Sequence, residues 1–524
     1  REKLPSTVQF KGHSDTETIL YYLKEYGITG VKDFNGIFAI ALLDKNAGQL
    51  YLARDPFGVK PLYYYEGEGN TLVFSSELSP ICNLVADAQG ELNKAALASL
   101  LRLRYNPAPD TLYASIKKVQ PGHYLSFDLS QKALAHTKEA YLEEVPSTQN
   151  LSEAAILKGY EEKLEAAIKR QLLSDVEVGI LLSGGIDSAL VAALANKHYG
   201  GKLKAFTVGF EGKYVEDEIA DAAETAEVLG LEHYYKRINF TDFITTMREC
   251  IRIVEEPLAT TSIIPMFFLA ELASQYVKVV LTGQGADEPL GGYTRYKSEL
   301  IQDKVPAFLH GLLSKAVQVS KIKNEKIIRG TRTLGIKDEI ERFLTVYQVF
   351  TTTEIEQLIG VTDSLSAERI AYFHRTLNCG VKSHSVERMM ALDARLNLAD
   401  DLLNYTDKVT MHFSLECRVP MLDLDLVKYI ESLPAAAKLN FKGGKIVHKQ
   451  FARNLLPDAI INRKKKGFQS PTKQWFKHEM STIQEILPRD GTPFSKVFNT
   501  QFVNEILQQH QQGYNREKQI FLLL

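Results

Sequence analysis

Two short clusters of glycine, hydroxyl and acidic residues in this chain have the composition of a phosphate-binding site. The first comprises Ser183, Gly184, Gly185, Ile186, Asp187 and Ser188, and the second comprises Thr282, Gly283, Gln284, Gly285, Ala286, Asp287 and Glu288. Glycines let a backbone turn tightly and approach a ligand, hydroxyls donate hydrogen bonds, and carboxylates can hold a Mg²⁺ that keeps several waters. The free N–H groups of a helix that starts after the first cluster would add anion-binding capacity. This combination predicts a pyrophosphate cradle.

The first cluster differs from a Walker loop, which ends in Gly-Lys-Ser/Thr and uses its lysine to bind the terminal phosphates. Asp187 stands instead where a carboxylate could hold Mg²⁺ against the phosphates. The difference favours nucleotidyl transfer with pyrophosphate leaving over hydrolysis of a γ-phosphate. The alternatives are a strand-to-helix turn without a ligand at the first cluster, and a simple helix cap formed by Asp287 and Glu288 at the second.

Each cluster follows an apolar run with the pattern of a buried parallel strand, at 178–182 and 277–282. Helices are expected nearby at 161–173, 189–198 and 217–229, and a further strand at 204–209. This alternation predicts a parallel sheet with helices on both faces, and such sheets bind ligands beyond the carboxyl ends of their strands. If the strands before the two clusters are neighbours, Asp187 and Asp287 face a shared Mg²⁺ and pyrophosphate.

The first 130 residues have a different pattern, in which a helix at 16–26, capped by Ser14 or Asp15, precedes short apolar strands. The strands are expected at 37–43, 49–53, 61–65 and 71–75. This predicts an antiparallel α+β domain. The polar segment 141–152 is the expected linker. We therefore predict two domains, 1–140 and 153–524, and the second has a helical pattern from 296 to about 480.

The overall composition excludes several classes of protein. Lys+Arg 62 against Asp+Glu 64 leaves no basic excess for nucleic acid, and no apolar run is long enough to span a membrane. Four cysteines without metal-ligand spacing favour the reducing cytoplasm, namely Cys82, Cys250, Cys379 and Cys417.

The chain resembles the glutamine-dependent asparagine synthetases of the B type, within the ATP pyrophosphatase superfamily, from about residue 8 nearly to its end. The first half carries this resemblance at 13–17, 34–39, 54–63, 75–77 and 121–123. The second half carries it at 174–188, 291–293, 414–423 and 462–468.

The resemblance implies a partial N-terminal-nucleophile (αββα) glutaminase domain, followed by an ATP-pyrophosphatase-type parallel sheet with a large helical C-terminal part. It implies that glutamine is hydrolysed in the first domain and that ammonia passes through an internal tunnel to the second. There, ATP and Mg²⁺ activate the side chain of aspartate as an acyl-adenylate, and ammonia forms asparagine with release of AMP. A homodimer is also implied.

The resemblance assigns roles to individual positions. Those matching adenosine contacts are Leu181, Val208, Thr282 and Gly283, and those matching the pyrophosphate loop are Ser183, Gly184, Gly185, Asp187 and Ser188. Asp187 and Asp287 match the metal ligands, and Lys445 matches the catalytic lysine, although a lone lysine is more often solvated surface. Asp15 matches the carboxylate that binds the glutamine amino group, or else caps a helix, and Glu288 is expected at the acceptor substrate.

The first departure from the family concerns its nucleophile, a cysteine at the mature N-terminus whose own α-amine serves as base. None of the four cysteines is terminal, and Arg1 to Leu4 resemble the stretch just after the last glutamine-binding motif. We expect the chain to be a truncation of an intact enzyme that, as it stands, does not hydrolyse glutamine. A native ammonia-dependent enzyme is the alternative.

Two further departures lie at positions that we expect near the acceptor carboxylate. Gln284 stands where the family commonly has Glu or Asp, and an amide can orient ammonia or substrate but cannot accept its proton. Thr260 stands where Asp is common. The open alternatives are therefore another carboxylate acceptor, intramolecular amide closure of the β-lactam synthetase kind, and a catalytically silent nucleotide-binding scaffold.

Overall fold

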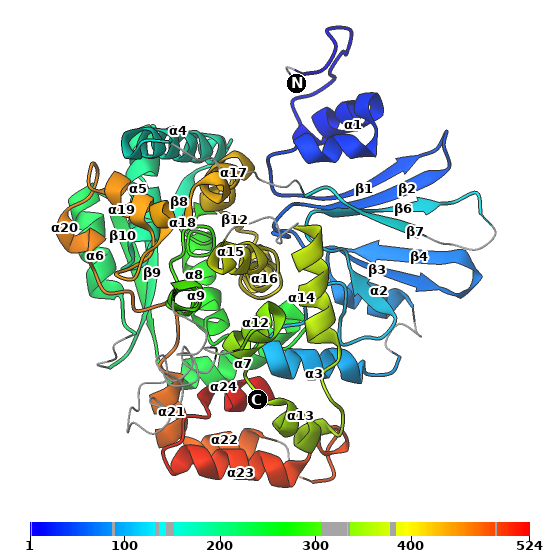
Figure 1. Ribbon diagram of the computed structural model, residues 1–524, viewed down its shortest axis with the longest axis vertical. Coiled ribbons are helices and arrows are strands. Elements are labelled where there is room, and N and C mark those ends of the chain that lie inside the picture. Colours follow the sequence, from blue (N-terminus) through cyan, green and yellow to red (C-terminus); the bar gives the residue numbers. More distant parts are fainter. Residues whose placement is uncertain are drawn as a thin grey trace.

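The computed structural model describes residues 1, 3–85, 90–131, 136–142, 151–212, 214, 216–304, 333, 336–377, 384–487 and 490–524. Most of the expected linker, 143–150, lies outside the described residues, and so does 305–332 of the expected helical part. Figure 1 shows antiparallel sheets on one side of the molecule and a parallel sheet surrounded by helices on the other.

The N-terminal part contains two antiparallel sheets. The first has the order β1-β2-β6-β7 and comprises β1 (Ala39–Asp44), β2 (Gln49–Arg54), β6 (His123–Asp128) and β7 (His136–Ala140). The second has the order β4-β3-β5 and comprises β3 (Tyr63–Gly67), β4 (Thr71–Ser75) and β5 (Ile116–Lys118). Leu52, Tyr64, Leu125 and Phe127 pack together between the sheets, because alternate residues of each strand point inward.

Helices lie outside these sheets, α1 (Asp15–Tyr26) beyond the first and α2 (Leu78–Leu84) beside the second (Figure 1). The αββα class expected for this half is therefore confirmed. Ser14 caps α1, since its hydroxyl accepts a hydrogen bond from the Glu17 N–H at 3.3 Å.

The second half contains a five-stranded sheet in which every neighbouring pair is parallel, in the order β10-β9-β8-β11-β12. The strands are β8 (Val178–Leu181), β9 (Lys204–Phe210), β10 (Glu232–Ile238), β11 (Val279–Leu281) and β12 (Glu416–Arg418). The sequence patterns did not predict β10 and β12. Both are edge strands: β10 carries charged and aromatic residues that are partly exposed, and β12 has only three residues, so neither forms a long apolar run.

Helices cover both faces of the parallel sheet, as predicted. Val178, Ile180 and Leu182 pack into one apolar cluster with α4 (Glu153–Leu172) and α5 (Ile186–His198). The helices α7 (Phe240–Val254) and α8 (Ile263–Ser274) contribute to a second cluster, which receives Leu181 and Val280. This alternation along β8 is what a strand buried on both faces requires.

The described residues after β11 are largely helical, as predicted, apart from β12. The helices of eight or more residues there are α9 (Arg295–Lys304), α12 (Glu339–Tyr347), α13 (Thr352–Ile359), α14 (Leu365–Thr376), α15 (Ser385–Arg395), α16 (Asn404–His412), α17 (Leu424–Ser432) and α23 (Thr500–Gln511), and the shorter α24 (Glu517–Leu523) is the last helix. One helix of the N-terminal half, α3 (Lys94–Leu103), joins them: Leu97 and Leu101 share the apolar cluster of Phe343 and Phe373. The packing boundary therefore does not coincide with the boundary in the sequence.

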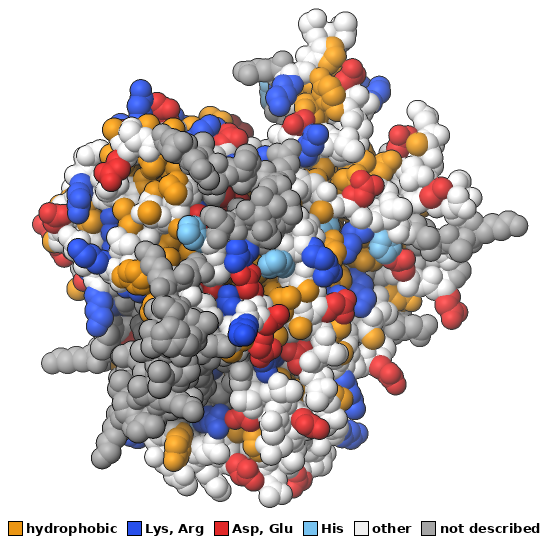
Figure 2. All heavy atoms as spheres, in the orientation of Figure 1, with side chains coloured by type: hydrophobic (Ala, Val, Ile, Leu, Met, Phe, Trp, Pro, Cys, Tyr) orange, Lys and Arg blue, Asp and Glu red, His pale blue; other side chains and the backbone are white. Residues whose placement is uncertain are grey.

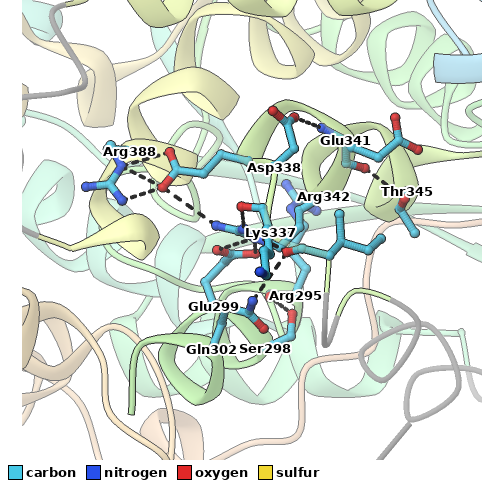
Figure 3. Close-up of polar contacts among 12 residues, drawn as sticks. Arg295, Ser298, Glu299, Gln302, Lys337, Asp338, Glu341, Arg342, Thr345 and Arg388 are labelled. Atoms are coloured by element: carbon cyan, nitrogen blue, oxygen red, sulfur yellow. Dashed lines mark hydrogen bonds and ion pairs between the residues drawn. The ribbon is translucent and has the colours of Figure 1, made fainter. Parts of the chain in front are cut away.

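Buried ion pairs hold α9, α12 and α15 together (Figure 3). The Arg342 side chain of α12 binds Glu299 of α9 at 3.0 Å and also donates to the carbonyl of Lys337 at 2.8 Å. Arg388 of α15 binds Glu339 of α12. At the other end of α9, Arg295 binds Asp393 at 2.7 Å. These contacts fix the start of α9, which follows the second glycine-rich cluster.

A second set of ion pairs joins the two halves of the molecule. A short π-helix (Leu398–Leu403) and α16 each contribute two residues that form ion pairs with the N-terminal half. These are Asp400 with Arg54 at 3.7 Å, Asp401 with Arg104 at 2.8 Å, Asp407 with Lys60 at 2.5 Å, and Lys408 with Glu77 at 3.0 Å. Most of these side chains are buried, so the halves are fixed relative to each other by desolvated charge pairs.

The surface carries no large excess of one charge on the face that Figure 2 shows, where acidic and basic side chains are interspersed. Within the described ranges, no helix is both long and apolar enough to cross a lipid bilayer.

Candidate active site

The two glycine-rich clusters lie side by side, because β8 and β11 are neighbouring parallel strands with Val280 opposite Gly179. The structure therefore meets the condition under which Asp187 and Asp287 were expected to face a shared site. Gly283 makes the closest approach. A Cβ at this position would lie 2.5 Å from the Ser188 nitrogen and 2.7 Å from the Asp187 carbonyl carbon. A larger residue would push the clusters apart, which is the physical reason for glycine here.

The first cluster is a compact turn held by its own hydroxyl groups. The Ser188 Oγ accepts the Ser183 N–H at 3.1 Å and lies 2.9 Å from the Ser183 Oγ, which accepts the Gly185 N–H at 3.2 Å. The following helix, α5, begins at Ile186 and not at 189 as expected. Asp187 therefore lies in the first turn of α5, beside the free N–H groups of the helix start.

The central feature of the site is the Lys445 ammonium group, which lies between two carboxylates from the two clusters. Its Nζ is 2.5 Å from the Asp187 Oδ2 and 2.7 Å from the Asp287 Oδ1. All three side chains are largely buried, with exposed fractions of 6%, 17% and 18%. The family resemblance assigned these three residues to one site, and in the structure the Lys445 ammonium group contacts both carboxylates.

The electrostatics of this group favour full charge on all three residues. Burial opposes ionisation of Asp187, but Lys445 and then His448 outweigh it and lower the pKa of the carboxyl below its ordinary value. Burial likewise opposes ionisation of Asp287, but Lys445 and Lys465 outweigh it, so the pKa of Asp287 is also lowered. The two carboxylates in turn overcome the desolvation of Lys445 and raise its pKa.

The backbone around Lys445 is shaped to bring its side chain to this place. Lys445 has a left-handed conformation, with φ at 60°, and it caps the helix α19 (Ile446–Ala452). Its N–H donates to the Leu290 carbonyl at 2.9 Å. Gly292 and Gly444 leave the necessary space: a Cβ on Gly292 would lie 2.0 Å from the Asp287 Oδ1, and one on Gly444 would lie 1.9 Å from the Gly291 carbonyl oxygen.

Sequence reasoning missed several basic residues that surround the two carboxylates. His448 lies with its Nε2 at 3.3 Å from the Asp187 Oδ1 and its Nδ1 at 2.6 Å from the Tyr160 hydroxyl. The Lys465 Nζ is 2.6 Å from the Asp287 Oδ2, and Arg463 donates to the Gly184 carbonyl at 3.0 Å. His448 stands three residues after Lys445, and Lys465 lies in a basic run, so both signals were present in the sequence.

The residues expected at adenosine lie along the same edge of the sheet. Leu181 is the last residue of β8, and Val208 lies in the carboxyl-terminal half of the adjacent strand β9; both are buried. The Thr282 N–H donates to the Arg418 carbonyl of β12 at 3.0 Å. This placement is compatible with a nucleotide beside the first cluster, and their contact with adenosine stays a prediction.

The residues expected at the acceptor substrate make different contacts, and their role at the substrate stays a prediction. Glu288 is 1% exposed and accepts a hydrogen bond from the Tyr293 hydroxyl at 2.8 Å. Burial and then the neighbouring Asp287 raise its pKa to about 7. Gln284 lies nearby, and its Oε1 has no hydrogen-bond partner among the residues that the structure describes. Thr260 is different: its hydroxyl donates to Asp401 at 2.6 Å and so belongs to the contacts between the two halves.

Asp15 lies far from the parallel sheet, in the exposed first turn of α1 (Figure 1). Its Oδ1 accepts the N–H of Thr16 at 2.7 Å, which is the local contact of a carboxylate at a helix start. A contact between Asp15 and glutamine stays a prediction.

The two carboxylates suit a magnesium ion that shares its remaining ligands with phosphate and water. Among the described residues, no group of three or more His, Cys, Asp and Glu side chains could hold a metal ion alone. Asp187 and Asp287 would therefore depend on phosphate oxygens and water to complete an octahedral shell. This is the usual arrangement for Mg²⁺ that binds with a nucleotide.

Comparisons with known proteins agree with this geometry. The Asparagine synthase family matches residues 159–524, and the Glutamine amidotransferase domain matches residues 1–141. The chain is 30% identical over 505 residues to asparagine synthetase [glutamine-hydrolyzing] 1 of Bacillus subtilis, which covers 96% of this chain and 78% of that protein.

Two further relatives show the range of the similarity. A putative asparagine synthetase [glutamine-hydrolyzing] of Mycobacterium tuberculosis is 32% identical over 486 residues, covering 89% of this chain and 72% of that protein. Amidase chyE of Penicillium rubens is 27% identical over 515 residues, covering 91% and 75%. Both matched domains are present in order along the chain, and the chain therefore belongs to the asparagine synthase family of ATP-dependent, amide-forming ligases.

Proposed function

We propose that this enzyme activates the side-chain carboxylate of aspartate with Mg²⁺ and ATP and joins it to ammonia, forming asparagine, AMP and pyrophosphate. The observation that supports this best is Lys445 held between Asp187 and Asp287 beside the glycine-rich turn. The similarity to two bacterial proteins named as an asparagine synthetase and a putative asparagine synthetase adds support.

The first step is adenylation of the acceptor. The hydroxyls of Ser183 and Ser188 and the N–H groups at the start of α5 bind the pyrophosphate. Asp187 and Asp287 would hold Mg²⁺, which would supply positive charge that makes pyrophosphate a better leaving group. A carboxylate oxygen of the acceptor bonds to the α-phosphorus while the bond from that phosphorus to the bridging oxygen breaks. Lys445 stabilises the negative charge that develops on the α-phosphate.

The second step forms the amide. The ammonia nitrogen attacks the acyl carbon, the bond to the AMP oxygen breaks, and one proton passes from the nitrogen to water. Lys445 stabilises the charge on the carbonyl oxygen during this attack. Gln284 orients the ammonia by hydrogen bonding, because its amide cannot take the proton. The ammonia comes from glutamine bound at the N-terminal domain, where Asp15 binds the glutamine amino group.

A different carboxylate acceptor is the second candidate, and Gln284 is the observation that favours it. The family commonly has an acid at this position, and this chain is also similar to a fungal protein that is named an amidase. The ligand chemistry near Gln284 and Glu288 would then differ from that of an asparagine synthetase. A homodimer and a cytoplasmic location accompany both candidates as predictions.

The experiment that tests the function supplies Mg-ATP and ammonium to the chain with a panel of carboxylic acids headed by aspartate. AMP, pyrophosphate and the amide product are measured, with Lys445→Met as the negative control. Asparagine in equal amount to AMP is the expected result. AMP only with another acid would replace aspartate by that acid, and no AMP with any acid from a folded chain would favour the silent scaffold.

A Gln284→Glu variant sharpens the choice of acceptor. A rise in asparagine synthesis would identify Gln284 as a change of specificity on the family scaffold. A fall would show that the amide has a role of its own in this enzyme.

A further inference from the structure

The position of Lys445 has a consequence for how metal enters the site. Its ammonium group contacts one oxygen of Asp187 and one of Asp287, at 2.5 and 2.7 Å, and so lies between the two carboxylates that would hold Mg²⁺. Lys465 contacts the other oxygen of Asp287 at 2.6 Å. The two negative charges of the acids are thus balanced by two ammonium groups of the same chain.

This balance is necessary because the acids are buried close to one another. Two ionised carboxylates that lie close together in a buried site repel each other, and an uncompensated buried charge costs several kcal/mol. Lys445, with only 6% of its side chain exposed, removes this cost and holds both acids ionised. A cation placed between them is therefore part of the fold, whether or not nucleotide is bound.

The backbone also indicates that this position of Lys445 is built rather than incidental. The residue has φ at 60°, a conformation that costs free energy for any residue other than glycine. Gly292 leaves room for its Cε, since a Cβ there would lie 2.3 Å away. A flexible surface lysine would need neither feature.

We propose that Lys445 is an internal counter-ion that takes the place of the metal between Asp187 and Asp287 until magnesium nucleotide binds. This inference rests on the proposed magnesium and ATP site. A free divalent ion must displace the ammonium group and gains only two carboxylates in return, so it binds weakly. When nucleotide accompanies the metal, the phosphates add oxygen ligands for the metal and an anionic partner for the displaced Lys445.

The exchange has a mechanistic consequence. Lys445 is released from the acids by the same event that brings the α-phosphate into the site. The lysine is therefore available for transition-state stabilisation only when metal and nucleotide are both in place. Adenylation without the metal would have to proceed while the lysine is still bound to the carboxylates.

The test measures binding of Mn²⁺, which replaces Mg²⁺ and is detected by electron paramagnetic resonance as loss of the free-ion signal. The full chain is titrated with and without α,β-methylene-ATP. For the wild type we expect nucleotide to tighten Mn²⁺ binding by at least about tenfold. For Lys445→Met we expect at least about tenfold tighter Mn²⁺ binding without nucleotide, and Lys445→Arg should stay close to the wild type.

Lys449→Met is the matched control. Lys449 lies one turn further along α19, and its N–H donates to the Lys445 carbonyl at 2.8 Å. Burial and then the charge of Lys445 lower its pKa, whereas the acids raise the pKa of Lys445. Its replacement removes one positive charge from the same helix without freeing the two carboxylates. If Lys449→Met and Lys445→Met tighten Mn²⁺ binding equally, the effect comes from the loss of any nearby positive charge. That outcome would overturn the proposal.

The wild type provides a reading that does not depend on any variant folding. Equally tight Mn²⁺ binding with and without nucleotide would overturn the counter-ion role and leave the metal site itself intact. Absence of Mn²⁺ binding even with the nucleotide analogue would overturn the proposed metal site as well. Melting temperatures recorded for each variant, with and without Mn²⁺, identify a variant that has lost its fold.

Discussion

Two lysines of this enzyme lie in nearly the same electrostatic arrangement and in very different surroundings. Lys445 contacts Asp187 and Asp287 at the carboxyl end of the parallel sheet. Lys408 contacts Glu77 and Glu255 where the two halves of the molecule meet, and its side chain is fully buried. Each lysine is bracketed by two carboxylates from distant segments of the chain.

The difference lies in what else the carboxylates contact. Glu255 accepts the N–H groups of Leu78 and Ser79, both at 2.7 Å, so it also caps the start of α2. Around Lys445 the carboxylates belong to two glycine-rich turns, at the carboxyl ends of β8 and β11. A buried lysine between two acids is therefore not by itself evidence of an active site, and the loops beside it decide which role the arrangement has.

The largest expected effect comes from breaking the interface arrangement. Lys408→Met removes the buried cation that Glu77 and Glu255 contact. Removing one partner of a buried ion pair destabilises proteins by about 3–5 kcal/mol. Urea unfolding of the variant should show this loss. The double variant with Glu77→Gln should recover part of it, and an unchanged unfolding midpoint for Lys408→Met would contradict the structural role.

The active-site arrangement should respond in activity. Lys445→Met is expected to lower ATP–pyrophosphate exchange about 100- to 1000-fold, the effect of removing one positioned charge from a transition state. The melting temperature should change less than it does for Lys408→Met. Loss of stability without loss of exchange in the folded fraction would mean that the two lysines have the same role.

A smaller effect is expected from the space around Lys445. Gly292→Ala places a Cβ 2.0 Å from the Asp287 Oδ1, so the carboxylate or the lysine must move, and about tenfold slower exchange should follow. Gly443→Ala is the control, because no atom lies within 4 Å of a Cβ at that position. Equal rates for the two variants would show that the close approach is not needed.

The smallest effect concerns pH at the interface. Burial raises the pKa of Glu77 to about 7 from an ordinary 4.5, although Lys408 opposes this. A carboxyl whose folded pKa is raised binds its proton more tightly in the folded state, so its contribution to stability falls as pH rises from 4.5 to 7. Melting temperatures between pH 5 and 8 should show this slope in the wild type. A slope that persists in Glu77→Gln would assign it to another group.

The sequence patterns were sufficient for most elements of the parallel sheet and for the two glycine-rich clusters, whereas Lys445 was found through the family resemblance. Strand β8 and the glycine-rich turn after it have strong local signals, namely a buried apolar run, paired glycines and a helix start. A general rule of open parallel sheets placed the ligand beyond the strand ends, and the structure supplied the adjacency of β8 and β11. Edge strands such as β10 lack such signals, because half of their residues meet solvent.

Contacts that depend on tertiary packing were beyond prediction. Thr260 was expected near the acceptor, which stays a prediction, and its hydroxyl binds Asp401 at 2.6 Å. Nothing in the local sequence indicates that partner, which lies 141 residues away along the chain. His448 and Lys465 were missed for a related reason, since a basic residue is usually solvated surface and only the fold brings these two to the carboxylates.

The helix α3 has a consequence for the modularity of this enzyme. It lies in the amidotransferase half of the sequence, while Leu97 and Leu101 pack into the core of the ligase half. Expression of residues 153–524 alone would expose the apolar side chains that α3 covers, such as Phe343 and Phe373. A transplantable ligase module of this enzyme therefore has to retain α3, and exchange of amidotransferase domains between relatives would replace part of the ligase core as well.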